Sequence, residues 1–378
     1  MADNQGQPRD EPHEGSVESV VSESVVSKSG RAVRLSVIIP VHNGEGYLSR
    51  CLACLQQSSF HDYEIIVVDD ASSDGSRRIA AAYDATVVAL EQKGGPARAR
   101  NRGAARARGE LLLFVDADVC VHPETLAQVD MYFRAHPTVD AVIGSYDDTP
   151  ADPGFVSQYK NLLHHYVHHT SRTDAWTFWA GCGAIRRACF LAAGGFDESY
   201  TRPCIEDIEL GFRLRAQGRR IDLHPAIQVT HLKRWTLPTL VRSDVLDRGI
   251  PWFRLMLRDG TMRSDLNVTG RQRLSVALVF TVVLGCAAAQ PLMLSGGQHS
   301  MLWLASAAAA LLLYVNRDLY RFFWRKRGPW FAAAVVPLHW LYYVYCGVAV
   351  GAGMSLHVWE KLSPKRQRLG QPWSKATR

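Results

Sequence analysis

Short apolar runs that alternate with helical patterns place the strongest constraint on the fold of this chain. Runs rich in β-branched residues predict strands at 34–41, 63–69, 85–90, 110–115 and 140–145. The stretches between them predict helices at 45–58, 75–84, 97–108 and 123–136. Strands without polar alternation are typical of parallel sheets covered by helices on both faces. The alternation therefore predicts βαβ units and an α/β domain with a Rossmann-like, mostly parallel sheet.

Paired carboxylates stand where two of these strands end. Asp69 and Asp70 close the second run, and Asp116 and Asp118 follow the fourth. Open parallel sheets bind their ligands outside the carboxyl ends of the strands, so we expect a site at this edge. Carboxylates at i and i+2 on a turn suit a hard divalent cation. Such a cation would neutralise the charge on a leaving diphosphate.

Further candidate residues lie in three places. Arg100, beside Asn101 in an arginine-rich helix, is the arginine we expect to contact a donor substrate, and its neighbours are expected to face solvent. Glu206 and Asp207 begin a helical pattern, where acidic residues are also ordinary complements of the helix dipole.

The third place is the segment HLKRW, at residues 231–235. His231 could join a carboxylate-bound metal. Arg234 could pair with a phosphate, and Trp235 could stack on a sugar ring.

Long apolar stretches fill the last third of the chain, at 274–294, 299–315 and 330–356. Arginine and lysine residues precede the first stretch and follow the second, which predicts a membrane hairpin with both ends in the cytoplasm. The basic tail after residue 360 also favours the cytoplasm, which a third full span would contradict. Either 330–356 is re-entrant or a tight helical pair, or the charge rule fails here.

The two flanks of the expected catalytic domain differ in character. Residues 1–33 predict a disordered acidic tail without a signal peptide, which leaves the next domain in the cytoplasm. Residues 236–273 form a connector whose amphipathic part fits a bilayer surface and a packed helix equally well. The net charge of +7 gathers around the apolar segments, which favours anionic lipid over nucleic acid as its partner.

Six motifs together resemble family 2 glycosyltransferases. They are VIIPVHNGEGYLSRCLACL, EIIVVDDASSDGS, GGPARARNRGAARARGELLLFVDAD, GCGAIRRACFLAAGGFDE, EDIELGFRLRAQG and HLKRW, in the family's order across residues 34–235. The resemblance implies a glycosyltransferase A-type fold, a nucleotide-sugar donor and inversion at the anomeric carbon. It also implies Mn²⁺ or Mg²⁺ as the cofactor.

The resemblance assigns roles by position. It places Pro40, Asn43 and Glu45 at the nucleoside pocket, Asp69 and Asp70 at the base and ribose, Arg100 on the donor side, Asp116 and Asp118 at the metal, and Asp207 as general base with Glu206 beside it. HLKRW is similar to the QxxRW motif of processive synthases, with His231 in place of Gln. That departure argues against processive polymerisation and leaves His231 as a metal ligand.

These observations predict five segments: a tail at 1–33, a catalytic domain at 34–235, a connector at 236–273, a membrane region at 274–356 and a basic tail at 357–378. We expect a multi-pass enzyme of the plasma (inner) membrane that transfers sugar from a nucleotide diphosphate donor to an acceptor hydroxyl or phosphate on a lipid or lipid-linked glycan. UDP is the first expectation for the nucleotide, with GDP and dTDP as alternatives. A processive polysaccharide synthase and a non-catalytic nucleotide-sugar sensor are the alternatives.

Overall fold

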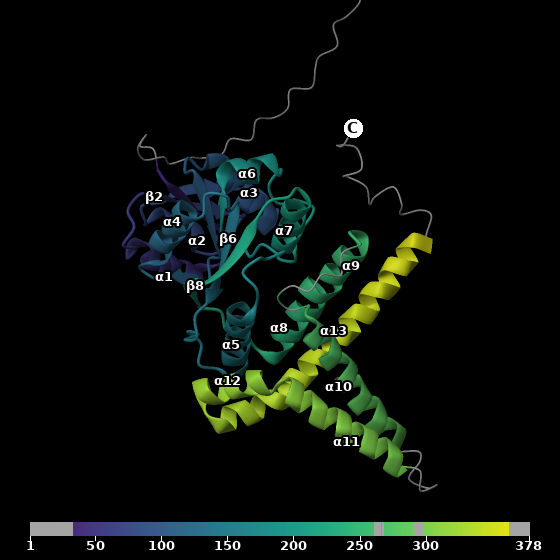
Figure 1. Cartoon of the computed structure of the whole chain (residues 1–378). Coiled ribbons are helices and arrows are strands. Elements are labelled where there is room, and N and C mark those ends of the chain that lie inside the picture. Colours follow the sequence, from purple (N-terminus) through teal and green to yellow (C-terminus); the bar gives the residue numbers. More distant parts are fainter. Residues whose placement is uncertain (1–32, 261–265, 267, 290–297, 363–378) are drawn as a thin grey trace, which may run out of the picture.

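The computed structural model describes residues 33–260, 266, 268–289 and 298–362, and shows an α/β domain followed by a group of helices (Figure 1). An eight-stranded sheet with the order β3-β2-β1-β4-β7-β6-β8-β5 forms the centre of the domain. Its strands are β1 (Leu35–Val41), β2 (Tyr63–Asp69), β3 (Thr86–Ala89), β4 (Leu111–Val115), β5 (Val119–Val121), β6 (Ala141–Tyr146), β7 (Cys182–Arg186) and β8 (Ile221–His231). All five predicted strands are present.

The first half of the sheet is parallel and the second half is mixed. β3, β2, β1 and β4 run parallel, and their register places Val41 opposite Asp69 and Ile38 opposite Phe114. β7 then pairs antiparallel with both β4 and β6, while β6 and β8 are parallel. Four of the seven pairings are parallel, which confirms the predicted fold class.

Helices cover both faces of the sheet. Successive residues of a strand point to opposite faces, and both sets are apolar here, so each face needs a layer of helices to bury it. Val37 and Ile39 of β1 pack into the cluster that holds α1 and α4, whereas Ile38 packs into the cluster that holds α3 and α7. The helices of the domain are α1 (Glu45–Gln56), α2 (Ser76–Ala81), α3 (Pro96–Arg106), α4 (Thr125–Ala135), α5 (Phe155–Thr170), α6 (Arg187–Ala192) and α7 (Glu206–Ala216).

The connector is helical from Leu237 to Arg258 and packs on other helices. It comprises α8 (Leu237–Arg242), the π-helical segment η1 (Ser243–Gly249) and α9 (Ile250–Arg258). Asp244 of η1 accepts a hydrogen bond from Lys160 of α5 at 2.5 Å and another from Tyr345 at 2.8 Å. The connector therefore joins the α/β domain to the last helix of the chain.

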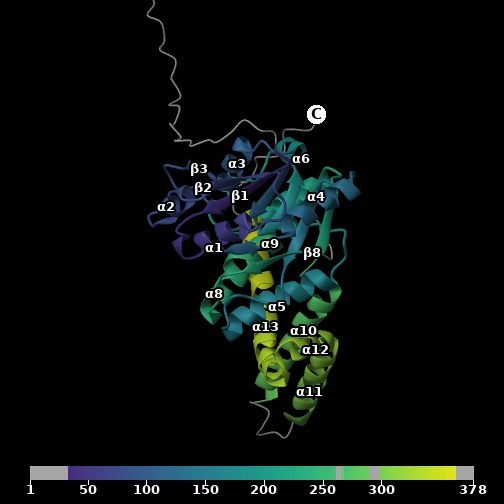
Figure 2. The same cartoon turned by 90° about the vertical axis from the view of Figure 1, so that its left-hand side faces the viewer.

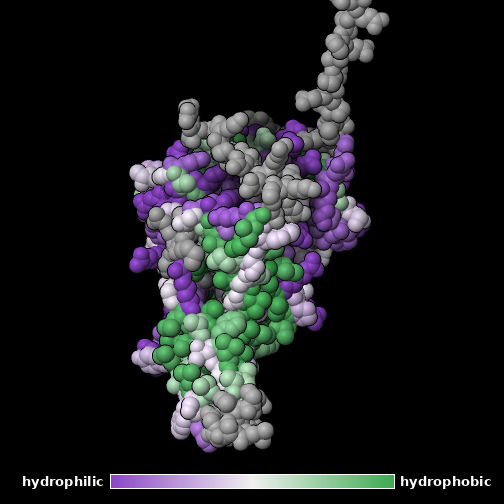
Figure 3. All heavy atoms as spheres, turned by 90° about the vertical axis from the view of Figure 1, so that its right-hand side faces the viewer, coloured by the Kyte–Doolittle hydropathy of each residue, from purple (hydrophilic) through white to green (hydrophobic). Residues whose placement is uncertain are grey.

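Four helices follow the connector: α10 (Gly270–Ala289), α11 (Gln298–Val315), α12 (Arg317–Arg327) and α13 (Pro329–Leu362). α10 and α11 pack together and point away from the sheet, as both side views show (Figure 1, Figure 2). By length and composition α10 and α13 could cross a membrane, and the pair α11–α12, bent by 59°, could supply a third span. The apolar surface extends continuously over this helical part, below the hydrophilic domain (Figure 3).

The last helix differs from the alternatives drawn from the sequence. α13 is one helix with Pro337 inside it, so the idea of a tight helical pair at 330–356 is wrong. Near its end, Glu360 pairs with Arg254 of α9 at 2.6 Å, on the side of the catalytic domain (Figure 1). Of the two predicted tails, residues 1–32 and 363–378 lie outside the described part of the chain.

Candidate functional site

A buried arginine joins the two acidic motifs. Arg100 of α3 donates one hydrogen bond to Asp116, just after β4, at 2.7 Å and another to Glu206, at the start of α7, at 2.8 Å. Its side chain is only 5% exposed. Burial alone would lower the pKa of Arg100, but the charges of Asp116, Glu206 and Asp207 raise it above its usual value. The arginine therefore stays charged and holds both acidic motifs at one edge of the sheet.

Asp118 forms a second arrangement with His231. The antiparallel pairing of β5 and β8 sets His231 opposite Val119, and its Nε2 lies 3.6 Å from Asp118 Oδ2. Burial would raise the pKa of Asp118, but His231, in its positively charged form with both ring nitrogens protonated, donates toward this carboxylate and lowers its pKa below the ordinary value. Asp118 is therefore ionised at neutral pH.

Asn161 of α5 fixes the tautomer of His231. The amide nitrogen of Asn161 donates to the backbone oxygen of Ser157 at 3.0 Å, so its Oδ1 must accept. His231 Nδ1 lies 2.7 Å from that Oδ1 and is therefore the protonated nitrogen. The unprotonated Nε2 then faces Asp118. Metal-binding histidines commonly have such a hydrogen-bonded second nitrogen.

The predicted metal ligands are only partly assembled. Among the described residues, no three side chains of His, Cys, Asp or Glu converge as a metal cluster, because Asp116 is turned toward Arg100. The Asp118–His231 pair nevertheless fits a divalent cation: it offers one carboxylate and one imidazole lone pair. It also leaves positions for diphosphate oxygens.

Asp207 lies beside the Arg100 bridge. Its Oδ2 accepts a hydrogen bond from the backbone N–H of Ala180 at 3.1 Å. Burial, together with the charge of Glu206, raises the pKa of Asp207 to about 6. A carboxylate with this pKa can accept a proton near neutral pH, as a general base must.

The residues predicted for the nucleoside pocket lie together at the ends of β1 and β2. Asn43 has a positive φ of 52° and accepts a hydrogen bond from Ser73 N at 2.8 Å. Glu45 likewise accepts from Gly75 N at 3.0 Å, and Asp69 from Ser72 N at 3.2 Å. Pro40 is level with Val68 in the sheet. These contacts tie the loops after the two strands to each other.

Asp70 stabilises the backbone turn at Gly94 and Gly95. Its two carboxylate oxygens accept the backbone N–H groups of Gly94 and Gly95 at 2.7 and 2.8 Å. Gly95 has φ of +88°, and a Cβ there would lie 2.4 Å from the carbonyl carbon of Thr201. Asp70 therefore anchors a glycine turn that no larger residue fits, and this turn leads directly into α3.

The ring of Trp235, predicted to stack on a sugar, is not accessible to a ligand in this structure. Trp235 is 8% exposed and packs in a cluster with Tyr159 and Phe323. Its ring is also covered by the ammonium of Lys233, 4.4 Å from the ring centre. Arg234 is exposed. Trp235 is thus a packing residue between the catalytic domain and the C-terminal helices.

Two residues near the site were missed from the sequence: Asn161 and Arg248. Asn161 lies 70 positions from the histidine that it orients, so no local pattern reveals it. Arg248 of η1 was one of several arginines in an amphipathic stretch. Its side chain lines a cleft that also contains Asp207.

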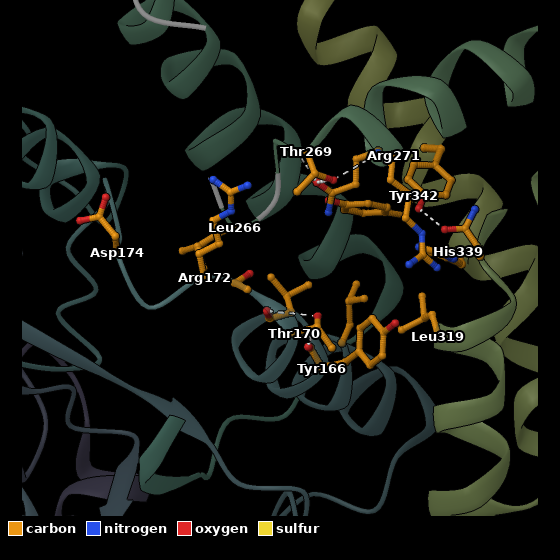
Figure 4. A pocket seen from close by; sticks show the side chains of 16 residues that line it. Tyr166, Thr170, Arg172, Asp174, Leu266, Thr269, Arg271, Leu319, His339 and Tyr342 are labelled. Carbon is orange, nitrogen blue, oxygen red and sulfur yellow. Dashed lines mark hydrogen bonds between the residues drawn. The ribbon is translucent and has the colours of Figure 1, made fainter. Parts of the chain in front are cut away.

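That cleft, of about 530 Å³, lies between the start of α7 and helices α9, α10 and α13. A neighbouring cavity of about 410 Å³ shares five lining residues with it, namely Leu163, Leu266, Gln272, Tyr342 and Tyr343. Figure 4 shows Arg172 and Arg271 among the side chains of this second cavity. None of the candidate catalytic residues lines the second cavity, so we assign it no part in the chemistry.

Comparisons with known proteins agree with this geometry. Residues 36–191 match the model of glycosyl transferase family 2. The validoxylamine A glucosyltransferase of Streptomyces hygroscopicus subsp. jinggangensis is 29% identical over 218 residues, covering 49% of this chain and 52% of that protein. The poly(ribitol-phosphate) β-glucosyltransferase of Bacillus spizizenii is 40% identical over 102 residues, covering 25% and 16% respectively. The chain thus spans about half, or less, of the length of these relatives.

The fold comparison extends further along the chain. The mannosyltransferase PcManGT of Pyrobaculum calidifontis, solved with GDP-Man and Mn²⁺, superposes with a TM-score of 0.53 at 20% identity. The match covers 88% of this chain and 89% of that one, so it includes helices beyond the α/β domain. The chain therefore contains a region, residues 36–191 from β1 to β7, that matches glycosyl transferase family 2, and its fold is of the glycosyltransferase A type.

Proposed function

We propose that this protein is a membrane-anchored, metal-dependent, inverting glycosyltransferase. It transfers a sugar from a nucleotide diphosphate, with a UDP-sugar as the first candidate, to an acceptor hydroxyl on a lipid or lipid-linked glycan. The observation that carries the proposal is the Arg100 bridge, because it brings the metal-side Asp116 and the base-side Glu206 to one guanidinium. The GDP-Man and Mn²⁺ bound to PcManGT support a nucleotide-sugar donor and a cation.

Each residue has a task in the transfer. Asp118 and His231 would hold the cation, whose charge would favour departure of the nucleotide diphosphate. Asp207 takes the proton of the acceptor hydroxyl while that oxygen forms its bond to the anomeric carbon. Attack from the side opposite the leaving group inverts the anomeric centre. Arg100 positions Glu206, next to the base, relative to the donor side.

The membrane part of the proposal is supported by the C-terminal helices. α10 and α11 would insert as a hairpin, and the catalytic domain would stay on the cytoplasmic face of the plasma membrane. The basic residues of α12, such as Lys326, which pairs with Asp148, then lie at the level of lipid headgroups.

A donor screen tests the proposal directly. Purified full-length protein is incubated with UDP-, GDP- and dTDP-sugars, with Mn²⁺, with Mg²⁺ or with EDTA, and release of the nucleotide is measured. We expect metal-dependent hydrolysis of one nucleotide class and a matching rise in the melting temperature. Absence of hydrolysis and of any melting shift across the whole screen would reject the proposed activity.

A further inference from the structure

The cleft beside Asp207 has polar residues in its lining but is apolar over most of its wall. Asp207 and Thr177 are among the polar residues. The apolar wall comes from the connector and the C-terminal helices and includes Trp252, Phe253, Met256, Val276, Phe280 and Val350. α10 and α13, which supply part of this wall, are the two single helices among the described residues that are long and apolar enough to cross a membrane. The cleft thus joins the proposed base to the apolar part of the molecule.

Arg248 gives the cleft an available cation. Its side chain is exposed, and it makes no hydrogen bond or ion pair with any other residue in the described ranges. Burial would lower the pKa of Arg248, but the charges of Asp207 and Asp244 raise it more than those of other residues do. Asp244 is already engaged by Lys160 and Tyr345, so the guanidinium of Arg248 remains open to a ligand.

The charges that line the cleft favour an anion. Lys160, Arg248 and Arg273 are basic, against Asp207 and Asp244, which leaves one net positive charge. The two histidines of the lining do not add to it: burial lowers the pKa of His168 to about 4, and that of His164 well below its usual value. An occupant with a hydrocarbon chain and one anionic group complements both parts of the cleft.

We infer that this cleft binds the acceptor, and that the acceptor is a phosphate-bearing lipid with a free headgroup hydroxyl. The inference rests on the proposed function and names its acceptor class. The hydrocarbon chain lies against Phe253, Phe280 and Val350, and the phosphate pairs with Arg248. The hydroxyl then reaches Asp207, which takes its proton as the oxygen bonds to the anomeric carbon and the nucleotide diphosphate leaves.

Lipid binding to the full-length protein in detergent tests the inference without activity. The probes are phosphatidylglycerol, which carries a phosphate and free hydroxyls, and phosphatidylcholine with the same chains, titrated by native mass spectrometry. We expect phosphatidylglycerol to bind at least tenfold more tightly, and to bind more tightly as its chains lengthen from six to eight carbons. Equal affinity for the two lipids, or equal affinity of free glycerol 3-phosphate and the lipid, would overturn the inference.

Two variants at one position and a control sharpen the test. Arg248→Gln should lose the preference for phosphatidylglycerol, and Arg248→Lys should keep most of it, whereas Arg242→Gln on the exposed side of α8 should bind as the wild type does. Preference retained in Arg248→Gln would remove Arg248 from the site. If the wild-type protein hydrolyses a nucleotide sugar but shows no preference for phosphatidylglycerol, only this inference is refuted. If it shows the preference but hydrolyses no donor, the proposed function is refuted and the lipid-binding cleft is retained.

Discussion

Asp116 and Glu206, 90 positions apart in the sequence, are bound by the two terminal nitrogens of one buried guanidinium, that of Arg100. This link fixes the distance between the end of β4 and the start of α7. The donor side and the acceptor side of the proposed reaction are therefore held together before any substrate binds. Preorganised placement of this kind is what transfer between two bound substrates needs.

Removing Arg100 should lower the stability of the protein as well as its transfer activity. Arg100→Ala leaves the buried carboxylate of Glu206 without its cation, and breaking such a buried ion pair costs about 3–5 kcal/mol. We expect a clearly lower melting temperature in detergent. The matched control is Arg102→Ala, on the exposed face of the same helix, for which we expect a change within about 0.5 kcal/mol. Equal melting temperatures for the two variants would refute the structural role of Arg100.

Asp207→Asn should remove the general base while preserving its shape. We expect transfer to fall about 10²- to 10⁴-fold, and the affinity for the nucleotide sugar, measured by calorimetry, to stay within a few-fold. The donor is expected to contact residues on other strands, so its binding should persist. Transfer at the wild-type rate would exclude Asp207 from proton transfer.

The rate should also depend on pH through Asp207. Its pKa is raised to about 6, and only the deprotonated form accepts a proton, so the transfer rate should fall as pH decreases through about 6 and level off above it. The measurement is the rate at saturating donor between pH 5 and 8, with donor binding checked at each pH. A flat profile across this range would contradict the assignment.

Asn161→Ala should weaken cation use although Asn161 is not a metal ligand. Without the Nδ1–H···Oδ1 bond, the unprotonated nitrogen of His231 is no longer directed at Asp118. We expect the Mn²⁺ concentration for half-maximal activity to rise about 10- to 100-fold. The maximal rate at saturating Mn²⁺ should recover, which distinguishes lost orientation from general damage. Asn101→Ala, which breaks the hydrogen bonds from α3 to Phe196 and Glu198, is the control and should leave the metal requirement unchanged.

The end of α13 should face the cytoplasm. Glu360 is paired with Arg254 of α9, beside the catalytic domain, so a reporter joined after Leu362 should be on the same side as that domain. Paired fusions to alkaline phosphatase, active when exported, and to a fluorescent protein that folds in the cytoplasm measure this. High phosphatase activity with low fluorescence would place the end of α13 outside.

The sequence predicted features that depend on neighbours along the chain. The strands β1 to β4 and β6 follow from their apolar runs, and Asp69, Asp116 and Asp118 follow from where those runs end. Arg100 was singled out from its arginine neighbours, and it is the buried one. Its partnership with Glu206 could not be predicted, because the two are 106 positions apart and the contact depends on how α7 approaches the sheet.

The features that the sequence did not predict have the same origin. Trp235 was expected to be open to a sugar because its motif resembles one that contacts substrate, but the tryptophan packs against residues of α5 and α12, such as Tyr159 and Phe323. Likewise, β7 inserts antiparallel between β4 and β6, and nothing in the local pattern of its residues gives the direction of the strand. Both features are set by segments distant in the sequence.

The helix α5 has a consequence for how the enzyme would work at a bilayer. Asn161 on this helix orients His231, and Gln158, three residues earlier, accepts a hydrogen bond from Arg327 of α12 at 2.8 Å. The same helix therefore orients the proposed cation ligand His231 through Asn161 and contacts α12 through Gln158. If the protein inserts into a bilayer as proposed, the depth of insertion would set the height of the reacting sugar above the lipid, and a change of membrane thickness would alter the catalytic geometry.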